Sequence, residues 1–206
     1  MTIETTDFPS LPQYIIDDIK AAVHRADLKD FTWSLDDLSH GENSEDHLGI
    51  DLIQQNVNVI GMDLGESNIG IADIAKSYNV RPPESVEEWV KANIDPDGIA
   101  KILVFKYGKL FNPHVDESRT YAFNCFVQQA TDSKTVVWKA KERYAGLPTI
   151  PQTYIPYTRI EIEEEQSIPT NQWYRLDVSK IHSMEGIDPN GTMIILSVDP
   201  DWHPDY

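Results

Sequence analysis

Short apolar and β-branched segments, separated by turn residues, fill the second half of this chain and limit its fold more than any other feature. Strands this short and closely spaced are typical of a β-sandwich or a jelly roll. In one of them Ile160 and Ile162 alternate with Glu161 and Glu163, which predicts one buried and one wet face. Its acidic run indicates an edge strand that resists pairing with another chain. The predicted strands cover 101–107, 111–116, 120–128, 134–140, 153–163, 173–178 and 193–198.

The first hundred residues have a different texture, with helical periodicity and polar loops. Ser10 is the predicted N-cap of an amphipathic helix. The chain of 206 residues is long enough for one well-buried core. We therefore expect a single domain over 1–206, mainly β with N-terminal helices, built as a helical or mixed annex over 1–100 and a jelly-roll core over 101–206. Within the annex, helices are predicted over 10–27, 67–78 and 84–92, a short strand over 30–35 and a polar loop over 36–46.

The charge balance narrows the choice of partners. There are 17 basic and 34 acidic side chains, a net charge of −17, which repels phosphate backbones and anionic membranes. We therefore expect a small-molecule or peptide substrate rather than nucleic acid or a membrane. The lone Cys125 cannot form an internal disulfide and is expected to be a core residue. With no signal-peptide pattern at the start and no apolar run of about 20 residues, a soluble, cytoplasmic protein is expected.

One stretch after a predicted strand carries metal-binding chemistry. His114 and Asp116 are two positions apart, so in an extended chain their side chains project from the same face. His182 is the candidate third donor. Two neutral imidazoles and one carboxylate on one side of a metal form the facial triad of non-haem Fe(II) oxygenases. Taken singly, each of the three also fits an ordinary loop or edge residue.

A second group of possible donors lies in the polar loop of the annex. His40 and His47 stand there among acidic residues. In so acidic a protein this pattern is typical of a solvated surface loop, which we prefer to a metal site.

The order of these parts resembles a known family. The segment Pro113–Arg119, the segment around Ile181–Glu185 and the apolar strand at 193–198 resemble the double-stranded β-helix Fe(II)/2-oxoglutarate-dependent oxygenases. The closest likeness is to the aspartyl/asparaginyl hydroxylase-like branch and its small, often virus-encoded relatives, whose Trp-His-Pro tail is similar to 202–204. The resemblance covers about 101–206. It implies Fe(II) and 2-oxoglutarate as cofactor and cosubstrate, and a cytoplasmic setting that includes that of a virus-infected cell.

The same resemblance implies places for the ligands. His114 and Asp116 should end the second major strand, and His182 should open the seventh. One departure stands out, because relatives carry an Arg or Lys about ten residues past the distal histidine, where this chain has Met193. A thioether cannot replace a guanidinium that pairs with the far carboxylate of 2-oxoglutarate. The residues predicted to bind cosubstrate in its place are Arg119, which we prefer, Arg175 or Lys139, with hydrogen bonds from Tyr121, Asn124 and Ser197.

The expected activity is hydroxylation of a peptide side chain or small molecule, coupled to oxidative decarboxylation of 2-oxoglutarate. Two alternatives stay open. One is a jelly-roll binding or structural protein, a viral one included, that has lost the reaction. The other is a cupin-type metalloenzyme that does not use 2-oxoglutarate. Met193 favours these alternatives, whereas the intact His-x-Asp and the distal histidine favour a metal site.

Overall fold

A computed structural model describes residues 2–26, 28, 75–116, 119–145, 155 and 157–200. The predicted strand at 30–35, the loop with His40 and His47 and the tail at 202–204 lie outside these residues. In chain order the elements are β1 (Ile3–Thr5), α1 (Gln13–Arg25), β2 (Lys76–Val80), α2 (Glu84–Asn93), β3 (Ile99–Lys106), β4 (Leu110–His114), β5 (Tyr121–Gln128), β6 (Lys134–Ala140), η2 (Glu142–Tyr144), η3 (Tyr157–Arg159), β7 (Ile160–Gln166), β8 (Trp173–Asp177), β9 (Ile181–Glu185) and β10 (Thr192–Asp199).

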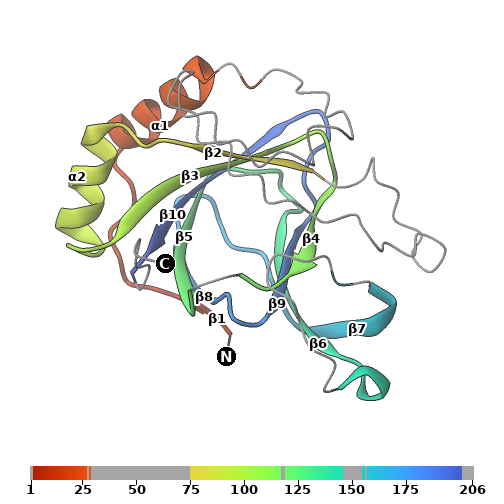
Figure 1. Ribbon diagram of the computed structural model, residues 1–206. Coiled ribbons are helices and arrows are strands. Elements are labelled where there is room, and N and C mark those ends of the chain that lie inside the picture. Colours follow the sequence, from red (N-terminus) through yellow and green to blue (C-terminus); the bar gives the residue numbers. More distant parts are fainter. Residues whose placement is uncertain are drawn as a thin grey trace, which may run out of the picture.

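The strands form two antiparallel sheets that face each other (Figure 1). The larger has the order β1-β8-β5-β10-β3-β2, and the smaller has the order β4-β9-β6-β7. From β3 to β10 the chain passes back and forth between the sheets, and this connectivity is that of a double-stranded β-helix, or jelly roll. The predicted fold class is therefore confirmed.

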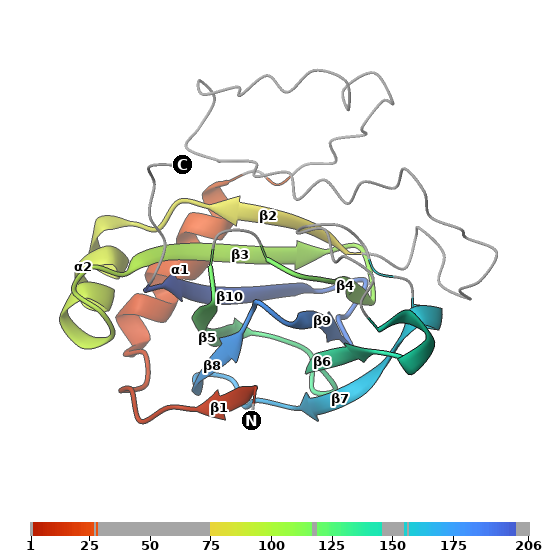
Figure 2. The same ribbon diagram turned by 60° about the horizontal axis from the view of Figure 1, so that its bottom comes forward.

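Strand β10, in the middle of the larger sheet, is buried on both faces because its alternate side chains serve two cores. On β10, Ile194 and Leu196 join a core shared with the helices, whereas Met193 and Ile195 face the interior between the sheets. Both helices lie on the outer face of this sheet (Figures 1 and 2). They add Ile15, Ile19, Val86 and Val90 to the outer core. Neither described helix is long and apolar enough to cross a membrane.

Several sequence predictions differ from the structure in the first hundred residues. Helix α1 begins after Pro12 with no side-chain cap, so Ser10 is not its N-cap. The helix expected over 67–78 is wrong at its described end, where Lys76–Val80 is a strand. Pairing of Tyr78 with Val104 of β3 overrides the local helical pattern there. Strands β1 and β2 thus give this part of the chain a share in the larger sheet, beside its two described helices.

The acidic strand β7 lies at the edge of the smaller sheet, as predicted. The prediction that Ile160 and Ile162 form a buried face is correct for Ile160 and wrong for Ile162. Ile160 is 2% exposed, but Ile162 is 50% exposed. A register shift between Val137 and Trp138 interrupts the β6–β7 ladder just where Ile162 pairs, so simple alternation fails at that point. Cys125 is a core residue, and burial raises its pKa to about 12.

Candidate metal centre

Two neighbouring strands of the smaller sheet bring the histidines together. His114 is the last residue of β4, and it pairs directly with His182 of β9 in the antiparallel ladder. Directly opposite residues project from the same face, and the two ring centroids are 4.4 Å apart. Asp116 follows β4 by two residues, and its backbone N–H donates to the carbonyl of Val178. Counting from β3, β4 is the second jelly-roll strand and β9 the seventh, as the resemblance implied.

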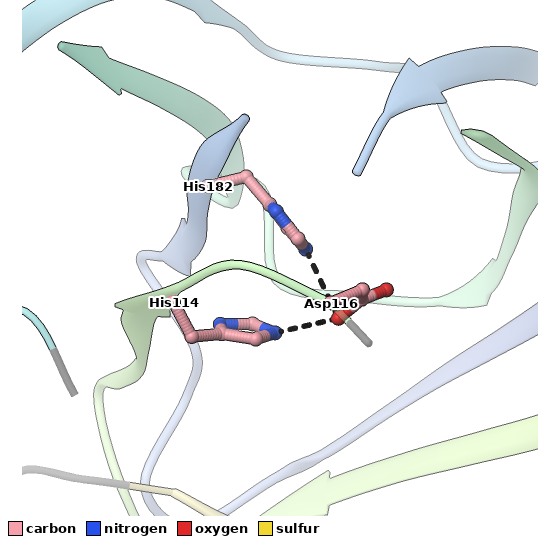
Figure 3. Close-up of side chains that lie close together, drawn as sticks. All are labelled: His114, Asp116 and His182. Carbon is pink, nitrogen blue, oxygen red and sulfur yellow. Dashed lines mark ion pairs between the residues drawn. The ribbon is translucent and has the colours of Figure 1, made fainter. Parts of the chain in front are cut away.

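Backbone carbonyls fix the orientation of both imidazoles. His114 Nδ1 lies 2.8 Å from the carbonyl oxygen of Asn112, and His182 Nδ1 lies 2.9 Å from that of Lys180. Each Nδ1 must carry the proton that it donates, so Nε2 of each neutral ring keeps a lone pair. These Nε2 atoms point at Asp116 Oδ1, at 3.2 Å from His114 and 3.8 Å from His182 (Figure 3).

Three acceptors therefore converge on one point inside the protein. Without a cation, a proton on an imidazole would relieve their mutual repulsion. A divalent metal would serve all three at once. The residues fit such an ion, because the donor atoms lie within 4.8 Å of one another. Donors at right angles around an ion at about 2.1 Å are about 3 Å apart, so shifts below about 1 Å complete the site.

The electrostatics keep the donors in their metal-binding forms. Burial, with a smaller effect from His114, lowers the pKa of His182 to about 4. Burial alone would raise the pKa of Asp116, but a hydrogen bond from His114 and the charge of His182, both in the protonated form of the imidazoles, and the permanent charge of Arg119 hold that pKa well below the ordinary range. At neutral pH His182 is neutral and Asp116 is ionised, as metal binding requires.

Arg119 braces the carboxylate ligand. Its Nε and Nη2 donate to Asp116 Oδ2 at 2.6 and 2.5 Å, and its Nη1 donates to Asp199. Lys101 Nζ donates to the other oxygen of Asp199 at 2.5 Å. The side chain of Asp199 is fully buried. Because Oδ2 of Asp116 is occupied by Arg119, Asp116 is arranged to offer one oxygen to a metal.

Lys101 and Asp199 are the members of this centre that the sequence analysis missed. The available signal was a charged residue in an otherwise apolar strand at a position that faces the interior. Asp199 is in phase with Met193 and Ile195 on β10, and Lys101 is in phase with Phe105 on β3.

A pocket of about 450 Å³ opens beside the donors. Besides the donors, its buried lining includes the apolar side chains Phe105, Phe111, Leu176 and Ile195. The more exposed lining is polar, with Arg81, Glu87 and Lys101 among its residues. The donors thus lie in the wall of a pocket with apolar side chains beside them and charged side chains at its rim, a form typical of small-molecule sites.

The predicted cosubstrate residues separate into two groups. Asn124 lines the pocket, and Ser197 is fully buried in the same phase of β10 as Ile195, with no hydrogen-bond partner for its hydroxyl among the described residues. Met193 is 2% exposed in the inner core, where it pairs with Phe105. No cation stands at the Met193 position.

The pocket lining does not include three of the predicted residues, Tyr121, Arg175 and Lys139, nor does it include Ser197. Arg175 falls between two interior-facing residues of β8, so strand alternation turns it outward. Its guanidinium stacks 4.9 Å from the ring centroid of Tyr121 and pairs with Glu4. Lys139 pairs with Glu161 at the surface. None of Tyr121, Arg175 and Lys139 lines the pocket.

Comparisons with known proteins add a likeness in fold. No family model matches the sequence, and no curated protein matches it. The similar solved structures include Bacillus subtilis oxalate decarboxylase, at 11% identity and a TM-score of 0.36, covering 68% of this chain and 29% of that one. Hazelnut (Corylus avellana) vicilin has 8% identity and a TM-score of 0.35, covering 62% and 30%. Brassica napus procruciferin, an 11S globulin, has 5% identity and a TM-score of 0.34, and the match covers 68% of this chain and 28% of that one.

These proteins are a decarboxylase with Mn(II) centres, a vicilin and an 11S globulin. This chain spans less than a third of the length of each of them. At such identities and TM-scores, the likeness carries no inference about activity. Function must therefore be argued from the site.

Proposed function

We propose that this protein is a mononuclear metalloenzyme with Fe(II) as its expected metal, and that it oxidises a small organic substrate held in the pocket. His114, Asp116 and His182 would bind the metal on one side and leave its other positions toward the pocket. One observation carries the proposal: two oriented Nε2 lone pairs and a carboxylate oxygen converge at a buried point. Bound there, iron would supply a Lewis acid and a redox centre for dioxygen.

The protein's own groups would prepare this centre. The carbonyls of Asn112 and Lys180 hold the imidazoles in the Nδ1–H tautomer, and Arg119 holds Asp116 to one free oxygen. Phe111 packs edge-on against His114, with ring centroids 4.9 Å apart, and Phe105 packs on Phe111. These rings limit water around the donors, which strengthens the electrostatic interactions there.

The second candidate is the 2-oxoglutarate-dependent hydroxylase that the resemblance implies. The strand positions of the His-x-Asp pair and the distal histidine favour it. The surroundings of Met193 weigh against it. Where relatives carry a basic residue for the distal carboxylate, Met193 packs between the sheets among apolar residues such as Phe105 and Ile195. A distal carboxylate would need a cation from the rim of the pocket instead. A cupin-type oxidase or dioxygenase without 2-oxoglutarate needs no such group, so we place it first.

An anaerobic titration distinguishes these candidates. The full chain is titrated with Fe(II), with equilibrium dialysis to count bound metal, and then with 2-oxoglutarate, with the visible charge-transfer band as readout. One Fe(II) per chain is expected, and none in a His114→Ala variant. Arg175→Gln, on the outer face of the larger sheet, is the matched control and should bind as the wild type does.

Each outcome supports one candidate. Iron binding without the visible band, followed by oxygen uptake with a small organic substrate and no 2-oxoglutarate, supports the first. A band that His114→Ala abolishes supports the 2-oxoglutarate-dependent hydroxylase. A chain that binds no Fe(II), Mn(II) or Zn(II) overturns the metalloenzyme proposal and leaves the non-catalytic jelly-roll protein.

A further inference from the structure

A row of polar side chains crosses the inner face of the larger sheet. Ser197 of β10 pairs with Lys101 of β3 on one side and with Asn124 of β5 on the other. Asn124 in turn pairs with Tyr174 of β8. Paired residues project from the same face of a sheet, and Lys101, Asn124 and Tyr174 all line the pocket. The larger sheet therefore presents hydrogen-bonding groups to a pocket that is apolar beside them.

The Asn124 amide is the member of this row with unused hydrogen-bonding capacity at the pocket wall. Its side chain hydrogen-bonds with the Tyr174 hydroxyl, which also accepts a hydrogen bond from Thr135 Oγ1 at 3.2 Å. Within the described part of the chain, the Asn124 side chain makes no other hydrogen bond. It is 7% exposed, and an amide has two N–H donors and an acceptor oxygen. A ligand that hydrogen-bonds with this amide would use groups that water barely reaches.

The charges around the pocket balance, which favours an uncharged ligand. Three basic and three acidic side chains line the pocket or pair with its lining: Arg81, Lys101, Arg119, Glu87, Asp116 and Asp199. Lys101 and Arg119 pair with the two aspartates. Arg81 and Glu87 bring one charge of each sign to the rim. A charged ligand would add a charge without a partner at the pocket wall, which is costly in apolar surroundings.

Aromatic rings lead from the apolar wall to the metal donors. The ring centroid of Phe111 lies 5.0 Å from that of Phe105 and 4.9 Å from that of His114. Both phenylalanines line the pocket, as does Ile195. Aromatic rings attract a further ring in edge-to-face or offset contact, beyond the gain from burial of apolar area. The pocket of about 450 Å³ has room for a substituted ring.

We propose that the pocket binds an uncharged phenol, with its hydroxyl at the Asn124 amide and its ring between Ile195 of the larger sheet and Phe111 of the smaller sheet. A hydroxyl both donates and accepts, so it pairs with either end of an amide. A phenol also keeps its proton at neutral pH. The ring then lies beside the donor His114, and as a substrate assignment the inference rests on the proposed function.

Isothermal titration calorimetry with two probes of the same shape tests the contact at Asn124. The probes are 4-methylphenol and 1,4-dimethylbenzene, which has a methyl group in place of the hydroxyl. The full chain is used in two states, treated with chelator and loaded anaerobically with Fe(II). In both states, Asn124→Leu should bind 4-methylphenol about tenfold more weakly than the wild type and should not weaken binding of 1,4-dimethylbenzene. An unchanged ratio of the two affinities would contradict the contact.

Thr135→Val is the matched control, because Thr135 also hydrogen-bonds with Tyr174 but does not line the pocket. It should keep the wild-type ratio of affinities. Loss of that ratio in Thr135→Val as well would assign the effect to the Tyr174 hydroxyl and overturn the contact at Asn124. Circular dichroism melts verify that each variant folds.

A measurement on the wild type decides the matter if Asn124→Leu does not fold. Nuclear Overhauser effects are recorded between the side-chain amide protons of Asn124 and the ring protons of 4-methylphenol, in chelator-treated, nitrogen-15-labelled protein. We expect such contacts at saturating ligand. Their absence would overturn the proposal.

Two further probes test the charge and the ring of the ligand. The anion 4-methylbenzoate should bind the chelator-treated protein at least about tenfold more weakly than 4-methylphenol, because the wall offers it no unpaired cation. The aliphatic alcohol 4-methylcyclohexanol should bind about fivefold more weakly, because it lacks the aromatic contacts. Equal affinities in either comparison would contradict the assignment of an uncharged phenol.

The two proposals fail in different ways. If 4-methylphenol binds only the iron-loaded protein and Asn124→Leu has no effect, the hydroxyl sits on the metal, and the inference is overturned while the metalloenzyme stands. If the phenol binds through Asn124 but no metal binds, the phenol site stands and the metalloenzyme proposal fails.

Discussion

At the scale of single residues, the carboxylate of Asp199 connects the metal ligand Asp116 to the larger sheet. It is fully buried, and it accepts hydrogen bonds from Arg119 and Lys101. Arg119 in turn holds Asp116 Oδ2. The position of one metal ligand therefore depends on a residue that would not touch the metal, as is common around metal centres.

Asp199→Asn should weaken metal binding about 10- to 100-fold, because Arg119 loses its second anion and holds Asp116 less firmly. It should also lower the free energy of unfolding by about 3 kcal/mol, since two cations lose a buried partner. Fe(II) or Co(II) titration and urea unfolding measure the two effects. The matched control is Glu161→Gln, which breaks the surface pair with Lys139 and should cost less than about 1 kcal/mol. Wild-type metal affinity in Asp199→Asn would show that Arg119 holds Asp116 without help.

His182 predicts a pH dependence of the metal-free protein. Its pKa falls from an ordinary 6.5 to about 4 on folding, mainly through burial. Between these values the unfolded chain binds a proton that the folded chain does not, so stability is complete above about pH 6.5 and is lost as pH falls toward 4. The loss should approach about 3 kcal/mol. Asp116, with an ordinary pKa of 3.8, titrates below this window.

The measurement compares urea unfolding of the wild type and of His182→Asn, both in chelator, at several pH values between 4 and 7.5. The wild type's free energy of unfolding minus that of His182→Asn should decrease as the pH is lowered from 6.5 toward 4, because only the wild type carries this group. A constant difference across the window would mean that His182 takes up its proton as easily in the folded protein as in the unfolded one.

At the scale of elements, alternation within short apolar segments was enough to predict most of the jelly roll. The strand predicted over 134–140 coincides with β6, and that over 193–198 lies within β10. The elements that were missed are those formed by long-range pairing. Strand β1 has three residues and exists because it pairs with β8, and the polar segment of β9 is held between β4 and β6. Local pattern carries no sign of such partners.

The candidate site shows the same division. His-x-Asp is a local motif, and the distal histidine follows it in an order that resembles a known family, so the three donors could be proposed from the sequence. The ion pair of Lys101 with Asp199 was harder to predict, since beyond the signal of a charged residue in an apolar strand it depends on the pairing of β3 with β10 in the larger sheet. The sequence did not indicate that Arg175 and Lys139 lie at the surface, because the phase of a strand, and not its composition, decides which side chains point inward.

The turn that follows β9 has a backbone requirement that can be tested. Gly186 has φ of +70°, and a Cβ there would meet the carbonyl oxygen of Asp132 at 2.3 Å. Gly186→Ala should therefore destabilise the fold by about 3 kcal/mol through backbone strain and a clash with rigid main chain. Gly191→Ala is the control, because there the nearest atom is an oxygen of the Asp188 side chain, which can move. Urea unfolding should show a loss below about 1 kcal/mol for Gly191→Ala, and similar losses in both variants would contradict the argument.

At the scale of the whole molecule, the metal donors come from the smaller sheet and from the segment that follows its strand β4. Asp199, which holds Arg119 in place, lies in the larger sheet. His114 and His182 lie on β4 and β9, and Asp199 lies on β10. A bound ion would therefore tie both sheets together through Asp116 and Arg119. The unfolded chain lacks this arrangement, so metal binding should stabilise the entire fold.

Metal at about 100 times its dissociation constant should add about 2.7 kcal/mol to the free energy of unfolding. For a chain of this length, that raises the thermal midpoint by about 5 to 10 °C. Differential scanning calorimetry with Zn(II), which avoids oxidation, measures the shift against a chelator-treated sample. His114→Ala should remove the shift, and Arg175→Gln should keep it. A shift that survives in His114→Ala would place the stabilising ion elsewhere, whereas a shift lost in that variant alone would tie the stability of both sheets to this one centre.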